Sequence, residues 1–136
     1  MKRRMELLGE FNGIRVFDDF AHHPTAIRLC LDGAREVAEG RVLAVLEPRS
    51  NTMKMGVHND ELSAALGQAD TVWAYQSDAL GWDLAAALSG DNVHIETDVA
   101  AIVAGVKAEA RPGDCVLIMS NGSFDGIYGL MCEALK

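Results

Sequence analysis

Residues 16–27 read Val16-Phe17-Asp18-Asp19-Phe20-Ala21-His22-His23-Pro24-Thr25-Ala26-Ile27, and this stretch decides the fold. An apolar strand runs into two carboxylates and two imidazoles, and a proline then opens a helix, where its missing N–H removes no hydrogen bond. Open α/β sheets build ligand sites at such strand ends, because the first amides of the following helix attract anions. Capping and solvating the helix start would use the same residues, so local context leaves both interpretations open.

An Asn-Gly pair upstream of this stretch predicts a β-hairpin. Asn12 and Gly13 separate the apolar runs 5–11 and 14–17. Both residue types accept the positive φ of a type I′ turn, so we predict two antiparallel strands that meet at this pair.

Strand and helix patterns alternate after the hairpin. The predicted elements are, in order, a helix over 24–38, a strand over 41–46, a helix over 59–67, a strand over 70–76, a short helix over 82–88, a strand over 93–96, a helix over 99–110 capped by Asp98, a strand over 115–119 and a last helix. Alternation of this kind predicts one α/β domain over residues 1–136. We expect a Rossmann-like, mainly parallel sheet with helices on both faces, preceded by the N-terminal β-hairpin.

Polar loops follow three of the predicted strands. The first contains Asp18 and Asp19, the second is 47–52 and the third is 120–126. Because the carboxyl ends of parallel strands lie at one edge of a sheet, we expect these loops to share that edge.

Composition excludes several classes of function. The net charge of −8 argues against a nucleic-acid surface, which needs clustered Lys and Arg. No apolar stretch approaches the roughly 20 residues that span a bilayer, and the N-terminus has no signal-peptide pattern, so we expect a cytoplasmic protein without membrane contact. The sequence contains no P-loop. The three cysteines and four histidines lack metal-ligand spacing, so we predict reduced structural thiols and no bound zinc.

Four motifs, taken in order, resemble the C-terminal domain of the Mur ligases. They are Lys2-Arg3-Arg4-Met5-Glu6, Asp18-Asp19-Phe20-Ala21-His22-His23-Pro24-Thr25, Glu47-Pro48-Arg49-Ser50-Asn51-Thr52-Met53-Lys54 and Ser120-Asn121-Gly122-Ser123-Phe124-Asp125-Gly126. The resemblance covers essentially all 136 residues. Within the family it is nearest to the ligases that attach a recycled tripeptide, because residues 48–54 depart from the His-Arg-aromatic-Thr-Arg pattern of the L-alanine ligases.

The resemblance implies an activity for a longer enzyme. Mur ligases activate a UDP-muramyl carboxylate as an acyl phosphate with ATP, and the incoming amine displaces the phosphate. The expected substrates are UDP-N-acetylmuramate and L-Ala-γ-D-Glu-meso-diaminopimelate, in peptidoglycan recycling, with ATP and Mg²⁺ as cofactors. An N-terminal and a central domain would hold the UDP-sugar, the P-loop and the magnesium. This chain would be the excised third domain, without catalytic residues or activity of its own.

The resemblance also implies roles for individual residues. The nucleotide contacts would be Arg4, Asp19 and His22, and the ribose hydroxyls would donate to Asp19. We expect Arg4 and Asp19 to be exposed. The tripeptide contacts would come from two loops, and they are Arg49, Ser50, Asn51, Thr52, Ser120, Asn121 and Ser123. A guanidinium suits a peptide with several carboxylates, so Arg49 is expected to matter most.

Three alternatives remain at this point. The chain could be the C-terminal domain of a UDP-N-acetylmuramate:L-alanine ligase, or a stand-alone anion- or nucleotide-binding α/β module. A phosphorelay receiver domain has a similar size and acidic strand ends, but it requires a lysine after its last strand. Residues 120–122, Ser-Asn-Gly, supply none.

Overall fold

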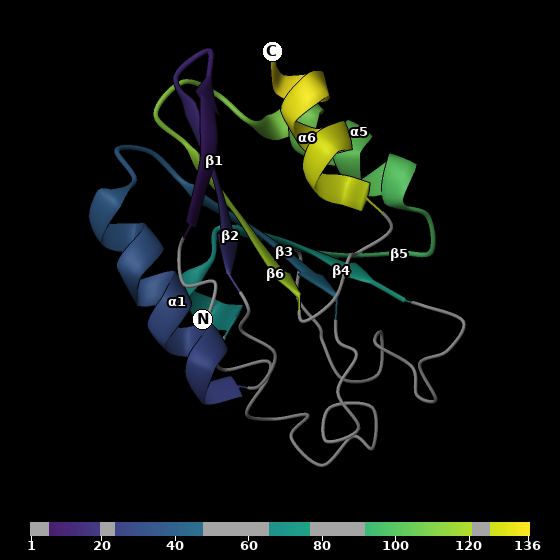
Figure 1. The fold of residues 1–136 in the computed structure, drawn as a ribbon. Coiled ribbons are helices and arrows are strands. Elements are labelled where there is room, and N and C mark those ends of the chain that lie inside the picture. Colours follow the sequence, from purple (N-terminus) through teal and green to yellow (C-terminus); the bar gives the residue numbers. More distant parts are fainter. Residues whose placement is uncertain (1–5, 20–23, 48–65, 77–91, 121–125) are drawn as a thin grey trace.

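The computed structural model describes residues 6–19, 24–47, 66–76, 92–120 and 126–136. Its six strands form a single sheet in the order β1-β2-β6-β3-β4-β5 (Figure 1). The strands are β1 (Glu6–Phe11), β2 (Ile14–Asp19), β3 (Val42–Glu47), β4 (Thr71–Tyr75), β5 (Val93–Glu96) and β6 (Cys115–Ser120). The helices are α1 (Pro24–Val37), α5 (Val99–Glu109) and α6 (Ile127–Leu135), with a 3₁₀ turn, η1 (Leu66–Gln68).

The predicted hairpin is confirmed, and so is the mainly parallel sheet. β1 pairs antiparallel with β2, and every other neighbouring pair of strands is parallel. Asn12 and Gly13 have φ values of 55° and 83°, the left-handed conformation that a tight hairpin turn requires. The edge strand β1 therefore precedes a parallel α/β unit, as the sequence predicts.

Helices cover both faces of the sheet. α1 packs on one face, and α5 and α6 pack side by side on the other (Figure 1). The central strand β3 is buried over its whole length. Its residues alternate between two cores: Val42, Ala44 and Leu46 join the core under α1, while Leu43 and Val45 join the core under α5 and α6. A strand buried on both faces explains the nearly continuous apolar run in the sequence.

Most predicted boundaries agree with the structure to within one residue. The helix predicted to end at 38 ends at Val37, and the strand predicted over 41–46 runs from Val42 to Glu47. Asp98 caps α5, because its side chain accepts a hydrogen bond from the amide of Ala100 at 3.1 Å. The predicted helix over 82–88 lies outside the described residues, as does most of the one over 59–67.

Two glycines give a testable pair of opposite effects on stability. A Cβ at Gly105 of α5 would lie 2.6 Å from Nε1 of the buried Trp73, whereas a Cβ at Gly33 of α1 would meet no atom within 4 Å. We expect Gly105→Ala to lower the free energy of unfolding by about 1–3 kcal/mol, through overpacking. Gly33→Ala should raise it by about 0.5–1 kcal/mol, because alanine is the better helix former. Urea unfolding of the two variants measures both changes, and a stabilised Gly105→Ala variant would contradict the packing described here.

Candidate functional site

The carboxyl ends of three adjacent strands meet at one edge of the sheet. Asp19, the last residue of β2, is in register with Met119 of β6, and Glu47, the last residue of β3, is in register with Ser120 of β6. Helices α1 and α6 both begin at this edge, which we call the carboxyl edge (Figure 1). The structure thus forms the arrangement in which open parallel sheets bind ligands.

Three buried carboxylates line the carboxyl edge. Asp18, Asp19 and Glu47 are 3%, 5% and 4% exposed, and each interacts with another group of the protein. The expectation that Asp19 is exposed is wrong. β2 continues through Asp19 and pairs there with β6, so this carboxylate lies inside the sheet ladder instead of beyond it.

Strand alternation places these carboxylates on different faces of the sheet. Phe17 belongs to the core under α1, and successive residues of a strand point to opposite faces, so Asp19 lies on the α1 face. Asp18 lies on the face of α5 and α6. Glu47 shares that face, since Val45, two residues before it, packs in the core there. The edge therefore presents an acidic group on each side of the sheet.

Helix starts supply hydrogen-bond donors beside these acceptors. The first amides of a helix have no partner within the helix and carry partial positive charge. The residue before α6 is Gly126, with φ 77°, and as a glycine it has no side chain with which to cap the helix. A carboxylate only accepts hydrogen bonds, so the edge combines acceptors for hydroxyl or ammonium groups with amides that suit anions.

Most of the residues predicted to bind ligands lie outside the described part of the chain. These are Arg4, His22, Arg49, Ser50, Asn51, Thr52, Asn121 and Ser123. Asp19 and Ser120 are described. They are the last residues of β2 and β6, which are neighbouring strands of the sheet. The burial of Glu47 was not predicted from the sequence. The feature that could have indicated it is a single carboxylate at the end of an otherwise apolar run.

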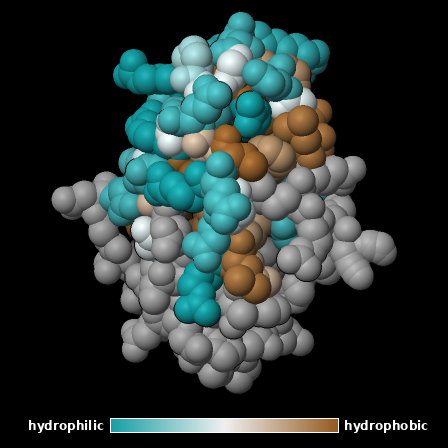
Figure 2. Space-filling view, turned by 90° about the vertical axis from the view of Figure 1, so that its left-hand side faces the viewer, coloured by the Kyte–Doolittle hydropathy of each residue, from teal (hydrophilic) through white to brown (hydrophobic). Residues whose placement is uncertain are grey.

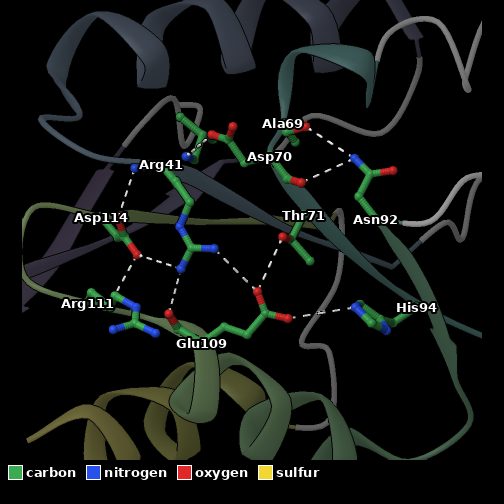
Figure 3. A network of polar contacts seen from close by, with 10 residues as sticks. Arg41, Ala69, Asp70, Thr71, Asn92, His94, Glu109, Arg111 and Asp114 are labelled. Atoms are coloured by element: carbon green, nitrogen blue, oxygen red, sulfur yellow. Dashed lines mark hydrogen bonds and ion pairs between the residues drawn. The ribbon is translucent and has the colours of Figure 1, made fainter.

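A different polar cluster occupies the opposite, amino-terminal edge of the sheet (Figure 3). Asp114 is buried and accepts hydrogen bonds from the backbone amides of Arg41 and Arg111, both at 2.9 Å. The Arg41 guanidinium reaches Oδ2 of Asp114 at 3.2 Å and the carbonyl oxygen of Glu109 at 2.6 Å. These contacts tie the end of α5 to the residues directly before β3 and β6.

The same cluster extends along the edge to β4 and β5. The Glu109 carboxylate accepts from the hydroxyl of Thr71 at 3.4 Å and lies 3.8 Å from Nε2 of His94 (Figure 3). The His94 ring stacks on Trp73, with 5.3 Å between the ring centroids. His94 is thus a packing residue of β5. The polar cluster at the amino-terminal edge connects α5 to the strands of the sheet, and it lies at the opposite edge from the carboxyl edge.

The three cysteines form no disulfide. Cys30 and Cys115 are buried, and Cys132 is half-buried. Burial raises the pKa of Cys115 to about 12, so its thiol stays protonated at neutral pH. Within the described ranges, no three His, Cys, Asp or Glu side chains are grouped so as to hold a metal ion. No helix there is long and apolar enough to cross a membrane.

Comparison with known families gives a match over most of the chain. Residues 3–122 match the family model for the Mur ligase, glutamate ligase domain. The UDP-N-acetylmuramate–L-alanyl-γ-D-glutamyl-meso-2,6-diaminoheptandioate ligase of Haemophilus influenzae is 48% identical over 99% of the chain and 31% of its own length. An L-alanine ligase from Mycolicibacterium vanbaalenii is 37% identical over 90% of the chain. The chain thus spans about a third of the length of these relatives.

Solved structures give the same match. The murein peptide ligase of Psychrobacter arcticus superimposes with a TM-score of 0.86 and 44% identity, over 98% of the chain and 30% of the ligase. A separately solved domain of a Haemophilus ducreyi protein, described as such a ligase, gives 0.79 and 41%, over 98% of the chain and all of that domain. At 16% identity, MurF from Thermotoga maritima, in complex with ADP, shares the fold with a TM-score of 0.76.

Proposed function

Because the chain belongs to the Mur ligase family, as its glutamate ligase domain, we propose that it is the C-terminal domain of an ATP-dependent tripeptide ligase. The full-length enzyme would join L-Ala-γ-D-Glu-meso-diaminopimelate to UDP-N-acetylmuramate in peptidoglycan recycling. An N-terminal and a central domain would precede residues 1–136. The tripeptide ligase is preferred to an L-alanine ligase because the respective relatives are 48% and 37% identical.

The carboxyl edge is the observation that carries this proposal. It combines buried carboxylates on both faces of the sheet with the starts of α1 and α6. ATP offers a ribose diol and phosphates, and the tripeptide offers carboxylates, amides and ammonium groups. An edge with acceptors and amide donors suits both molecules.

We assign the two ligands to different parts of this edge. Asp19 lies on the α1 face and would accept hydrogen bonds from the ribose, with Arg4 and His22 nearby. The tripeptide would contact the loops after β3 and β6, through Arg49, Ser50, Asn51, Thr52, Ser120, Asn121 and Ser123. Magnesium would be held mainly by the central domain, as the resemblance to the Mur ligases implies.

The proposed ligase reaction requires the N-terminal and central domains of the full-length enzyme. ATP with bound Mg²⁺ supplies the activated phosphate, and a P-loop neutralises charge at the transferred group. This chain's residues would bind and orient the nucleotide and the peptide, and domain closure would exclude water. The isolated 136 residues should therefore bind ligands without turning over ATP.

An Asp19 variant tests the nucleotide assignment in the full-length enzyme. We expect Asp19→Asn to lower kcat/KM for ATP about tenfold or more, as the loss of a charge-assisted hydrogen bond of ~1.5–3 kcal/mol implies. The KM for tripeptide should change little. Asp32→Asn, at an exposed position of α1, is the matched control and should leave both constants unchanged. Unchanged ATP kinetics with a lowered melting temperature would make Asp19 a structural residue and contradict the assignment.

A further inference from the structure

The hairpin turn between β1 and β2 holds a dipeptide with chemistry of its own. An asparagine followed by glycine is prone to deamidation, because glycine has no side chain to hinder attack by its backbone nitrogen on the asparagine carboxamide. Asn12 and Gly13 form such a pair, and Asn12 is exposed. The top of the molecule, where this turn lies in Figure 1, is mainly hydrophilic in the view of Figure 2, so water can reach the pair.

The side chain of Asn12 is bonded to the end of α6. Its Nδ2 donates to the carbonyl oxygen of Leu135, the last residue of this helix, at 2.7 Å. The last carbonyls of a helix have no partner within the helix, so this hydrogen bond satisfies one of them across 123 positions of sequence. A carbonyl oxygen only accepts hydrogen bonds, and therefore only the amide nitrogen of the Asn12 side chain can serve here.

The backbone of the turn is also held in place. Asn12 and Gly13 are both in the left-handed conformation, and the carbonyl oxygen of Gly13 accepts a hydrogen bond from the amide of Gly113 at 2.8 Å. Attack on Cγ of Asn12 by the Gly13 nitrogen requires the side chain to fold back onto its own backbone. The bond to Leu135 holds the side chain toward α6 instead. The folded turn therefore opposes a reaction that its sequence favours.

We propose that Asn12 is a deamidation site that the last turn of α6 protects, and that the reaction, once it occurs, detaches the hairpin from this helix. The backbone nitrogen of Gly13 forms a bond to Cγ of Asn12, and the bond from Cγ to Nδ2 breaks. Nδ2 leaves as ammonia together with the proton of the Gly13 amide. Water then opens the cyclic imide at either carbonyl, which gives aspartate or isoaspartate with no change of oxidation state.

The nitrogen that leaves is the atom that binds α6. An aspartate at position 12 is ionised at neutral pH and has no donor for the carbonyl oxygen of Leu135. Its negative charge would also face the carboxyl end of α6, where the helix dipole is negative, so the two would repel each other. α6 packs on β1 and β2, and it contributes Ile127, Met131 and Leu135 to the core. Deamidation should therefore loosen the end of α6 on the sheet.

Peptide mass spectrometry of the 136-residue chain tests the protection. A separately solved domain of nearly the same extent supports the use of the chain on its own. The peptide map separates position 12 from the other Asn-Gly pair of the sequence, at 121–122. In mildly alkaline buffer, aspartate and isoaspartate at position 12 should form about tenfold more slowly in the folded chain than in urea, because the reaction needs local opening. Equal rates in the two conditions would overturn the proposal.

Two glycine variants test whether α6 provides the protection. Glu133 is exposed in the last turn of α6, and Glu36 is exposed in the last turn of α1. Glu133→Gly should speed the reaction at position 12 about threefold or more, because glycine is a poor helix former and frays the end of α6. Glu36→Gly is the matched control and should leave this rate nearly unchanged. Equal acceleration by both variants would mean that the reaction depends on global unfolding, and would contradict protection by α6.

Two substitutions at position 12 test the consequence of the reaction. Asn12→Asp reproduces one product, and Asn12→Gly keeps the left-handed turn while removing the donor without adding a charge. Amide hydrogen exchange of residues 131–135 should be about threefold or more faster in Asn12→Asp than in the unsubstituted chain, with Asn12→Gly between the two. Exchange in α1 is the internal control and should stay the same. Unchanged exchange of residues 131–135 in the Asn12→Asp variant would refute the detachment of α6.

Discussion

Asp114→Ala should lower the free energy of unfolding by about 3–5 kcal/mol, which would be the largest stability loss that we expect from one substitution at the amino-terminal edge. The buried carboxylate accepts hydrogen bonds from the amides of Arg41 and Arg111 and from the Arg41 guanidinium. Alanine would leave two backbone donors without an acceptor, at about 1–3 kcal/mol each. Urea unfolding of the variant, followed by circular dichroism, measures the loss.

Asp98→Ala is the matched control for this prediction. Asp98 caps α5 with a single hydrogen bond to the amide of Ala100 at an exposed position. Its loss should therefore cost about 1 kcal/mol. If Asp114→Ala costs no more than this control, the buried cluster around Asp114 does not fasten α5 to the sheet as described.

Arg49→Ala should weaken use of the tripeptide by the full-length enzyme by one to two orders of magnitude. The tripeptide carries several carboxylates, and a guanidinium pairs with a carboxylate through charge-assisted hydrogen bonds of roughly 1.5–3 kcal/mol. In the sequence, Arg49 comes two residues after Glu47, the last residue of β3, and β3 ends at the carboxyl edge. Steady-state kinetics with each substrate varied in turn measure the effect, and the constants for ATP and UDP-N-acetylmuramate should stay nearly unchanged.

Arg35→Ala controls for the loss of a positive charge. Arg35 is 42% exposed and pairs with Asp70 at the amino-terminal edge, so its removal should not change tripeptide kinetics. A raised KM for ATP in the Arg49 variant, with tripeptide kinetics unchanged, would assign Arg49 to the nucleotide and refute the division of the carboxyl edge into two sites.

Local sequence patterns predicted the fold well. The Asn12-Gly13 turn and the apolar run of β3 have direct physical causes in a few neighbouring residues: a positive φ at the turn, and burial of the strand on both faces. Pro24 and Asp98 mark helix starts for equally local reasons. Element type and order therefore follow from residues that are close together in the sequence.

Burial and long-range contacts could not be predicted in the same way. Asp18 and Asp19 look like rim residues in the sequence, yet both lie within the β2–β6 ladder. The contact between Arg41 and Asp114 joins residues 73 positions apart, and no local pattern indicates it. The resemblance to the Mur ligases implies which loops would bind ligands, and the structure shows the strand ends that those loops follow.

The choice of acceptor substrate by the full-length protein tests the central claim most directly. The measurement is the rate of amide formation on UDP-N-acetylmuramate with ATP and Mg²⁺, comparing L-Ala-γ-D-Glu-meso-diaminopimelate with L-alanine. We predict that kcat/KM is at least 100-fold higher for the tripeptide, which corresponds to about 2.7 kcal/mol of discrimination in the transition state. A higher kcat/KM for L-alanine, or no amide product with either amine, would contradict the account.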